Sequence, residues 1–253
     1  MNFANKLKDT IDRFSPISLK EMDRVRFMRR TDTKYILEIE KMPILLEKVL
    51  ADYYMVEINH IREQLYETTY FDTNDYQMYT IHHNGKLNRH KIRIRKYVFS
   101  DMAFLEVKKK NNRGETIKNR IPKEDEGHHL DFEGSGSFLE KYTPYNHELL
   151  WPKLGNRFIR LTLVNKDLSE RITLDYDLRF TDLKYHKQIQ TEGICIVEIK
   201  RNRDHQNSPF VKALSEFRVF PSGFSKYCMG LAMLNPEIKT NIFKQKIKKI
   251  TDL

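Results

Sequence analysis

The chain has 253 residues, of which 40% are hydrophobic and 11% aromatic, and this composition excludes a disordered protein. Its 45 lysines and arginines exceed its 35 acidic residues, and the formal net charge of +10 predicts an anionic partner: nucleic acid, nucleotide, inorganic polyphosphate or an anionic membrane surface. No stretch reaches the roughly 18 apolar residues that a membrane-spanning helix needs, and the N-terminus lacks a secretory pattern. Two cysteines, Cys195 and Cys228, are too few for a disulfide framework and predict a reduced, cytoplasmic protein.

The first half of the chain alternates helix-period and strand-period segments. An amphipathic helix over 1–14 precedes Ser18-Leu-Lys-Glu21, a capping-box pattern that opens a helix towards Arg29. The following segments are predicted as strand, helix, strand and helix over 30–37, 40–52, 64–72 and 76–83.

The centre of the chain, residues 89–122, is predicted to form strands joined by a turn at Asn112-Arg-Gly114. Beyond it we expect a loop, a helix, three strands and two helices over 124–136, 136–150, 157–165, 170–180, 193–201, 208–219 and 225–234. The basic amphipathic tail over 237–250 predicts either a solvated helix or, with helix 1–14, a peripheral contact with an anionic membrane or a membrane protein at the inner face of the membrane.

The expected architecture is one α+β domain over 1–253, with its core at about 14–235 and a tail at 237–253. Helices flank a mostly antiparallel barrel of about eight strands. In five of the strand segments, charged and apolar residues alternate, so that each strand has an ionic side and an apolar side. These segments are Lys91-Ile-Arg-Ile-Arg95, Phe104-Leu-Glu-Val-Lys108, Thr116-Ile-Lys-Asn-Arg120, Arg171-Ile-Thr-Leu-Asp175 and Val197-Glu-Ile-Lys200.

A charged row is often only the wetted face of an antiparallel sheet. Here all five segments repeat the pattern, arginine is abundant, and single acids stand beside the bases, also at Lys110 and in the continuation Asp177 and Arg179. This mixture favours an inverted arrangement, in which the ionic rows line the inside of the barrel and helices cover its apolar outside. Such a lumen implies a bound ligand or water.

Other chemistries find little support in the sequence. There is no Walker loop and no G-x-G-x-x-G, and the adjacent pairs His82-His83 and His128-His129 indicate surface loops and not a zinc site. A metal would be a hard cation held by carboxylates and phosphate oxygens, which favours Mg or Mn. Tyr97, Phe99 and Tyr185 leave RNA binding open, but an almost purely ionic face argues against nucleic acid as the partner.

Seven motifs recur in an order that resembles a known family. They are Arg30-x-Asp-x-Lys-Tyr35, Tyr70-Phe-Asp72, Lys91-x-Arg-x-Arg95, Phe104-Leu-Glu-Val-Lys-Lys109, Arg171-Ile-Thr-Leu-Asp175, Val197-Glu-Ile-Lys200 and Phe224-Ser-Lys226. Together, over about 14–235, they resemble the VTC domain, the polyphosphate polymerase branch of the triphosphate tunnel metalloenzymes (the CYTH-like superfamily). The resemblance implies an eight-stranded tunnel, a catalytic Mn or Mg, and transfer of the ATP γ-phosphoryl group to a growing inorganic polyphosphate chain.

The resemblance also implies roles for residues of this chain. The positions of the catalytic phosphate-binding bases are Lys34, Arg93, Arg95, Lys108, Arg171 and Lys200. Further phosphate contacts are expected at Arg30, Lys91, Ser225 and Lys226. Lys110 and Arg120 continue the basic row and are expected to bind phosphate on that ground, not from the resemblance. The metal-holding glutamate is Glu198, and the acids Glu106 and Asp175 are expected to assist it.

One departure bears on the choice of reaction. The wider superfamily begins with an E-x-E-x-K strand, whereas this chain has Arg30-x-Asp-x-Lys34, which replaces a metal ligand by a phosphate contact. The departure favours a polymerase. Two alternatives remain open: a metal-dependent triphosphate hydrolase, and a non-catalytic module that binds polyphosphate, inositol phosphate or RNA.

Overall fold

The computed structural model describes residues 2–22, 30–124, 127, 129–202 and 207–252, and of Arg30 the backbone alone. Its strands join in one 11-stranded sheet. They are β1 (Pro16–Ile17), β2 (Arg30–Glu38), β3 (Tyr53–Val56), β4 (Gln64–Asp72), β5 (Arg89–Tyr97), β6 (Met102–Lys110), β7 (Thr116–Lys123), β8 (Trp151–Asn165), β9 (Glu170–Asp182), β10 (Gln188–Thr191) and β11 (Ile194–Asn202).

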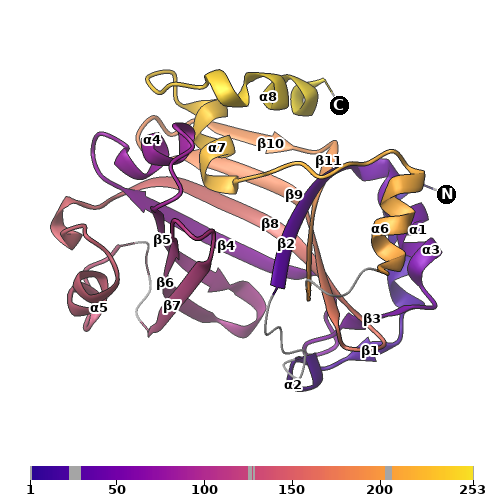
Figure 1. The fold of residues 1–253 in the computed structure, drawn as a ribbon. Helices are drawn as coiled ribbons and strands as arrows, with labels where there is room; N and C mark the ends of the chain where they lie inside the picture. Colours follow the sequence, from indigo (N-terminus) through magenta and orange to yellow (C-terminus); the bar gives the residue numbers. More distant parts are fainter. Residues whose placement is uncertain (1, 23–29, 125–126, 128, 203–206, 253) are drawn as a thin grey trace.

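Helices surround this sheet (Figure 1). The α-helices are α1 (Phe3–Asp12), α2 (Leu19–Met22), α3 (Met42–Val49), α4 (Gln77–His83), α5 (Ser135–Tyr142), α6 (Pro209–Glu216), α7 (Lys226–Leu234) and α8 (Lys244–Thr251). Short 3-10 turns are η1 (Ile39–Lys41), η2 (Val98–Ser100), η3 (His147–Leu149) and η4 (Asn241–Phe243). None of these described helices is long and apolar enough to cross a membrane.

The main path of the sheet has eight strands in the order β2-β11-β9-β8-β4-β5-β6-β7, and every neighbouring pair on it is antiparallel. The α+β architecture with a mostly antiparallel sheet is therefore confirmed. In the described part of the chain no pairing joins β2 to β7, so the sheet does not close completely, which is consistent with the predicted tunnel fold. The short strands β1, β3 and β10 were missed because two to four residues carry no readable period.

Most local predictions agree with the structure. The capping box is present, since the backbone N–H of Ser18 donates to Glu21 Oε2 at 2.9 Å and the N–H of Glu21 to Ser18 Oγ at 3.3 Å. The described part of that helix ends at Met22, and the predicted continuation over 23–29 lies outside the described residues. The predicted helix over 136–150 is instead α5 and the turn η3, because Thr143 takes an extended conformation before Pro144.

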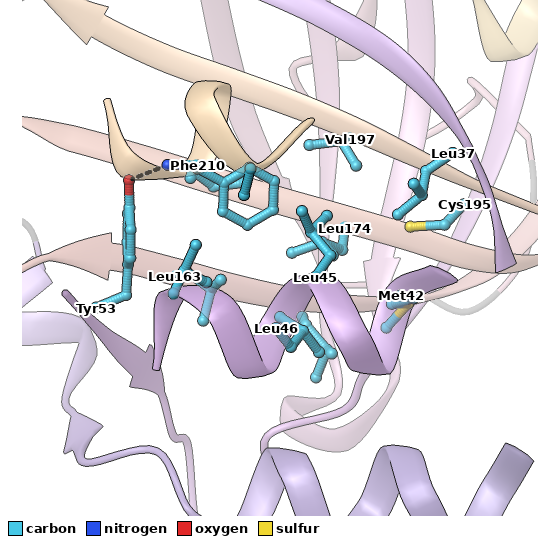
Figure 2. Close-up of a cluster of buried hydrophobic side chains, with 14 of the residues drawn as sticks. Leu37, Met42, Leu45, Leu46, Tyr53, Leu163, Leu174, Cys195, Val197 and Phe210 are labelled. Carbon is cyan, nitrogen blue, oxygen red and sulfur yellow. Dashed lines mark hydrogen bonds between the residues drawn. The ribbon is translucent and has the colours of Figure 1, made fainter. Parts of the chain in front are cut away.

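Helices α1, α3 and α6 cover the apolar face of one half of the sheet. Alternation in β11 sends Cys195, Val197 and Ile199 to this side, where they are at most 1% exposed. Figure 2 shows the α3 leucines packed among these strand residues, with the Tyr53 hydroxyl accepting from the Phe210 N–H at 3.3 Å, which ties α6 to β3. Both cysteines are buried and free, as expected.

At the other half of the sheet, α5 covers the corresponding face. The apolar residues of β5 and β6 that alternate with the charges, among them Ile92, Ile94, Leu105 and Val107, form a cluster with Leu139 of α5. All five are at most 3% exposed. The apolar rows are thus the helix-covered rows, as the inverted arrangement predicted.

Helix α7 packs on the opposite face of the sheet, at one end of the charged rows. Its Tyr227 and Leu231 bury with Ile36, Leu154 and Ile196, whose neighbours two positions along β2, β8 and β11 are polar. Figure 1 shows α7 beside α4 and over β9. Helix α7 can pack closely on the sheet because residue 230 is glycine. A Cβ at this position would lie only 2.6 Å from the Phe180 side chain and 2.7 Å from the Leu154 side chain.

We expect Gly230→Ala to destabilise the protein by about 1–3 kcal/mol, because the added methyl forces α7 away from the sheet, although alanine favours helix. The measurement is urea unfolding of wild type and variant. Gly223→Ala is the matched control, since no atom lies within 4 Å of the place that a Cβ would take there. Equal stability of the two variants would contradict the close packing of α7.

Candidate functional site

The register of the sheet brings the predicted bases together on one face. Arg93 pairs with Glu106 across β5 and β6, and Lys91 pairs with Lys108. Across β8 and β9, Arg160 pairs with Asp175. Directly paired residues of an antiparallel ladder project to the same side, so each strand adds its charges to a common surface.

Strand β4 connects the two halves of this surface. Its Thr68 pairs with Arg95 on one side and with Asn156 of β8 on the other. At the far end, Glu198 of β11 pairs with Lys34 of β2. We call this surface the ionic face; among its charged residues on the strands are Asp32, Lys34, Arg89, Lys91, Arg93, Arg95, Glu106, Lys108, Lys110, Lys118, Arg120, Arg160, Arg171, Asp175, Glu198 and Lys200.

Glu106 is fully buried in the ionic face and is matched by two bases. Its Oε2 accepts from Arg93 Nε at 2.8 Å and Nη2 at 2.6 Å, and Lys118 forms an ion pair with its Oε1. Burial alone would raise the pKa of Glu106, but the charges of Arg93, Arg95 and Lys118 outweigh it and hold that pKa far below its usual range. The neighbouring bases therefore favour the charged carboxylate.

Asp175 forms a second such group. Arg160 grips it with two bonds, Nε to Oδ1 at 2.5 Å and Nη2 to Oδ2 at 2.7 Å, and Lys226 forms an ion pair with Oδ2. Burial opposes ionisation here too, yet the charges of Arg160 and Lys226 hold the pKa of Asp175 far below its usual range. Arg160 is not among the residues predicted from the sequence, although it stands between the apolar Ile159 and Leu161 as the bases of the other strands stand between apolar residues.

Glu198 is the most accessible of the three acids. Its Oε2 lies 3.1 Å from Lys200 Nζ and its Oε1 3.8 Å from Lys34 Nζ, and 18% of its side chain is exposed. Burial would raise its pKa, but Lys34, Lys200, Arg160 and Lys108 hold the pKa well below the usual value. Each of the three acids is thus shared by two bases.

Three cations of the ionic face have no such partner. No described carboxylate lies within 4.0 Å of Lys91, Arg95 or Lys108. Burial lowers the pKa of Lys91 and of Arg95, and the charge of Arg93 together with burial lowers the pKa of Lys108 well below its usual value. Glu106 and Glu198 act on Arg95 and Lys108 only from a distance, and an anion with several oxygens is the ligand that would form the missing ion pairs.

The N-terminus of α7 points into this set of cations. Ser225 caps the helix by accepting from the Cys228 N–H at 3.3 Å, and the same hydroxyl accepts from Lys91 Nζ at 3.0 Å. Lys34 Nζ donates to the Phe224 carbonyl at 3.0 Å. The helix start adds backbone N–H groups and a positive dipole end to the ionic face, which favours anions further. Ser225 and Lys226 therefore lie beside the other bases of the ionic face.

Other predicted residues lie at the margins. Arg171 is half-buried opposite Lys200, and Lys110 pairs with Arg89 and Thr116 at the end of β6. Arg120 is exposed and lies over the Phe104 ring, at 4.5 Å from its centre. The side chain of Arg30 lies outside the described residues.

The prediction that Asp177 and Arg179 continue the charged row of β9 was wrong. The pairing of β8 with β9 shifts by one residue between Arg157 and Ile159 of β8. The extra residue in β9 is Asp177, which has a φ of 50°. A bulge of one residue turns the following side chains to the other face. Arg179 therefore pairs with Arg157 away from the ionic face and forms an ion pair with Asp177 at 3.3 Å.

The histidine pair 82–83 was also misplaced. Both residues belong to α4 and not to a surface loop, and His83 is 8% exposed beside Tyr79 and Phe243. Burial, reinforced by the charge of Lys91, lowers the pKa of His82 to about 3. Among the described residues no group of three or more His, Cys, Asp or Glu is arranged to hold a metal by itself.

We expect Asp175→Asn to destabilise the protein by about 3–5 kcal/mol, because it leaves Arg160 and Lys226 buried without a counter-charge. The control is Asp177→Asn on the same strand, where the ion pair is exposed and the expected change is below about 1 kcal/mol. Chemical unfolding measures both. Similar stability of the two variants would show that the ion pairs of the ionic face are not structural.

Binding of an inorganic triphosphate should take up protons at pH 8.5. Burial, as the largest cause, lowers the pKa of Lys118 to about 8, and the pKa values of Lys91, Lys200 and Lys226 are also lowered. A bound anion favours the charged lysines and raises these values, so affinity falls as the pH rises above about 8. Because the unfolded state binds more protons in that range, the empty protein becomes more stable over the same rise.

Calorimetric titration in two buffers of different ionisation enthalpy measures this uptake. A binding enthalpy that does not depend on the buffer at pH 8.5 would mean that the lysines are fully charged before the anion arrives.

Comparisons with known proteins give one family assignment. A search of curated proteins finds no match. Among solved structures, a "putative adenylate cyclase" from Vibrio parahaemolyticus is 13% identical, with 79% of this chain and 96% of that chain covered and a TM-score of 0.47. One from Hippeastrum, described with a dominant triphosphatase activity, is 16% identical over 81% of this chain and 96% of that chain, also at 0.47. Assignment rests instead on the family model of the VTC domain, which matches residues 29–235. The chain belongs to the VTC domain family.

Proposed function

We propose that this protein is a polyphosphate polymerase that transfers the γ-phosphoryl group of ATP to the end of an inorganic polyphosphate chain on the ionic face. The family match supports an enzyme that acts on triphosphates. The cations Lys91, Arg95 and Lys108 support a ligand with several phosphate groups, since one phosphate cannot neutralise all three.

One observation favours transfer to a phosphate acceptor over hydrolysis. Three acids of the ionic face, Glu106, Asp175 and Glu198, have a lowered pKa because each is held by two bases. A general base for water works best with a pKa near the operating pH. The end of a polyphosphate chain is already anionic and needs no such base, so these weakly basic carboxylates suit transfer to it.

The proposed roles follow from position. Arg95 and Lys108 neutralise the transferred group, and Arg93, held in place by Glu106, presents its remaining N–H donors beside them. Lys91 and Ser225 at the start of α7 bind the neighbouring phosphate. The other predicted bases, Lys34, Arg171, Lys200 and Lys226, complete the positive field. Phosphoryl transfer is catalysed mainly by such positioning and charge neutralisation.

Glu198 is the proposed holder of a divalent cation, Mn or Mg. The fit is to an ion that takes most of its ligands from phosphate and water, because the described residues supply no cluster of three protein ligands. Glu198 keeps 18% of its side chain exposed and has a lowered pKa, whereas Glu106 and Asp175 are buried against their bases and orient them. When bound, the ion would neutralise phosphate charge next to the bases.

The test is phosphorus NMR of the purified protein with ATP and Mn, comparing wild type with Arg95→Ala and Glu198→Gln. We expect wild type to form internal polyphosphate and a matching amount of ADP, and each variant to lose roughly 100- to 1,000-fold in rate. Arg157→Ala is the control, since it removes a half-exposed arginine from the other face of β8 and should keep full activity.

The spectra also separate the alternatives. Orthophosphate without internal polyphosphate would replace the proposal by a triphosphate hydrolase. An unchanged ATP spectrum, with triphosphate still bound, would leave a binding module.

A further inference from the structure

One end of the ionic face is aromatic, which the sequence analysis did not foresee. The register that aligns the bases also places Tyr66, Tyr97, Phe104 and Phe158 on the same face: Tyr66 pairs with both Tyr97 and Phe158, and Phe104 pairs with Arg95. The view of this face as almost purely ionic was therefore wrong. Tyr97 and Phe104 occupy the end at which β5 runs into η2, whereas Phe158 lies under Lys226, the first residue of α7, at 4.4 Å from its Nζ to the ring centre.

The four rings form a continuous series. Tyr66 stacks on Phe158 with ring centres 5.3 Å apart, Tyr66 and Tyr97 are 5.0 Å apart, and Tyr97 meets Phe104 edge-on at 5.9 Å. Phe158 is buried, but the other three rings are only half-buried. A part of the ring series is thus open to a ligand and is not sealed core.

Arginines lie over these rings. Arg160 and Arg95 lie 5.0 Å and 5.4 Å from the centre of Tyr66, and Arg120 lies 4.5 Å from the centre of Phe104. Arg120 belongs to the edge strand β7 and is exposed. Aromatic rings and guanidinium planes are the surfaces on which proteins stack nucleobases.

The ionic face therefore has two different ends, one charged and one aromatic. In β5 the inward residues run Lys91, Arg93, Arg95, Tyr97, from the start of α7 to the rings. Six residues of strand span about 20 Å. A nucleoside triphosphate has the same two ends: charged oxygens at one and a flat, apolar base at the other. Inorganic triphosphate has only the first.

We propose that the aromatic end, Phe104 with Arg120 and Tyr97, binds the nucleobase of the nucleoside triphosphate, with the phosphates directed along β5 towards Lys91 and α7. This inference rests on the proposed function, since it assumes that the triphosphate of ATP lies on the ionic face. Stacking recognises the face of a base and not its edge, so ATP and GTP should bind with affinities within a few-fold of each other.

The experiment compares two ligands, ATP and inorganic triphosphate, by calorimetric titration of wild type and Phe104→Leu. We expect the variant to lose roughly 5- to 100-fold in ATP affinity, the contribution of one base–aromatic stack, and to bind triphosphate within about twofold of wild type. Phe104→Tyr keeps the ring and should keep ATP affinity. Phe99→Leu, at an exposed phenylalanine in η2 outside the ring series, is the matched control.

Arg120→Gln provides a second variant at an exposed position where folding is not at risk. It should weaken ATP more than triphosphate. An equal loss of both ligands in Phe104→Leu and Arg120→Gln, or no loss of ATP in either, would overturn the nucleobase site and leave the proposed function standing. Failure of wild type to bind either ligand would overturn both. Binding of both ligands with the expected discrimination but no polymer formation would sink only the proposed reaction.

Discussion

Three carboxylates hold six cations on one face of a sheet, and the site depends on this pairing. Glu106 is shared by Arg93 and Lys118, Asp175 by Arg160 and Lys226, and Glu198 by Lys34 and Lys200. Without these acids the repulsion among buried bases would oppose folding, and with more of them no anion would bind. The balance leaves a folded protein with a surplus of positive charge, and the surplus lies at Lys91, Arg95 and Lys108.

The apolar half of the molecule makes this arrangement possible. Helices α3, α5 and α6 cover the outward rows, so the sheet obtains its hydrophobic stabilisation there and its inward rows are free to carry charge. Helix α7 packs on the side of the ionic face, and Asp72 fixes it there. This fully buried acid accepts from the Tyr227 hydroxyl of α7 and from the N–H groups of Met78 and Tyr79 in α4, the latter two at 2.9 Å each. The start of α7 is thereby held against Lys91.

The sequence predicted the structure well where charged and apolar residues alternate regularly within a strand. It predicted little where the pairing of strands that are distant in the chain determines which residues lie together. Alternation in β5, β6 and β11 correctly divided ionic from apolar residues, and the motif order gave the family. The same interpretation failed at Asp177, because a single inserted residue leaves no mark on composition but reverses the face of Arg179. Arg160 and the aromatic end were missed because Tyr66, Tyr97 and Phe158 come from three strands that only the register brings together.

The position of the paired and unpaired charges gives the ionic face a direction. At the α7 end, Lys91 donates to the neutral Ser225 hydroxyl and lies at a positive helix terminus. At the other end, the charge of Arg95 and Arg160 is partly met by the Tyr66 ring, which can be stacked upon but cannot neutralise a phosphate. Electrostatic attraction for an anion therefore rises from the rings towards α7. A ligand with one neutral, flat end and one highly charged end would be aligned by this gradient before any specific hydrogen bond forms, whereas a uniform polyphosphate chain would not be.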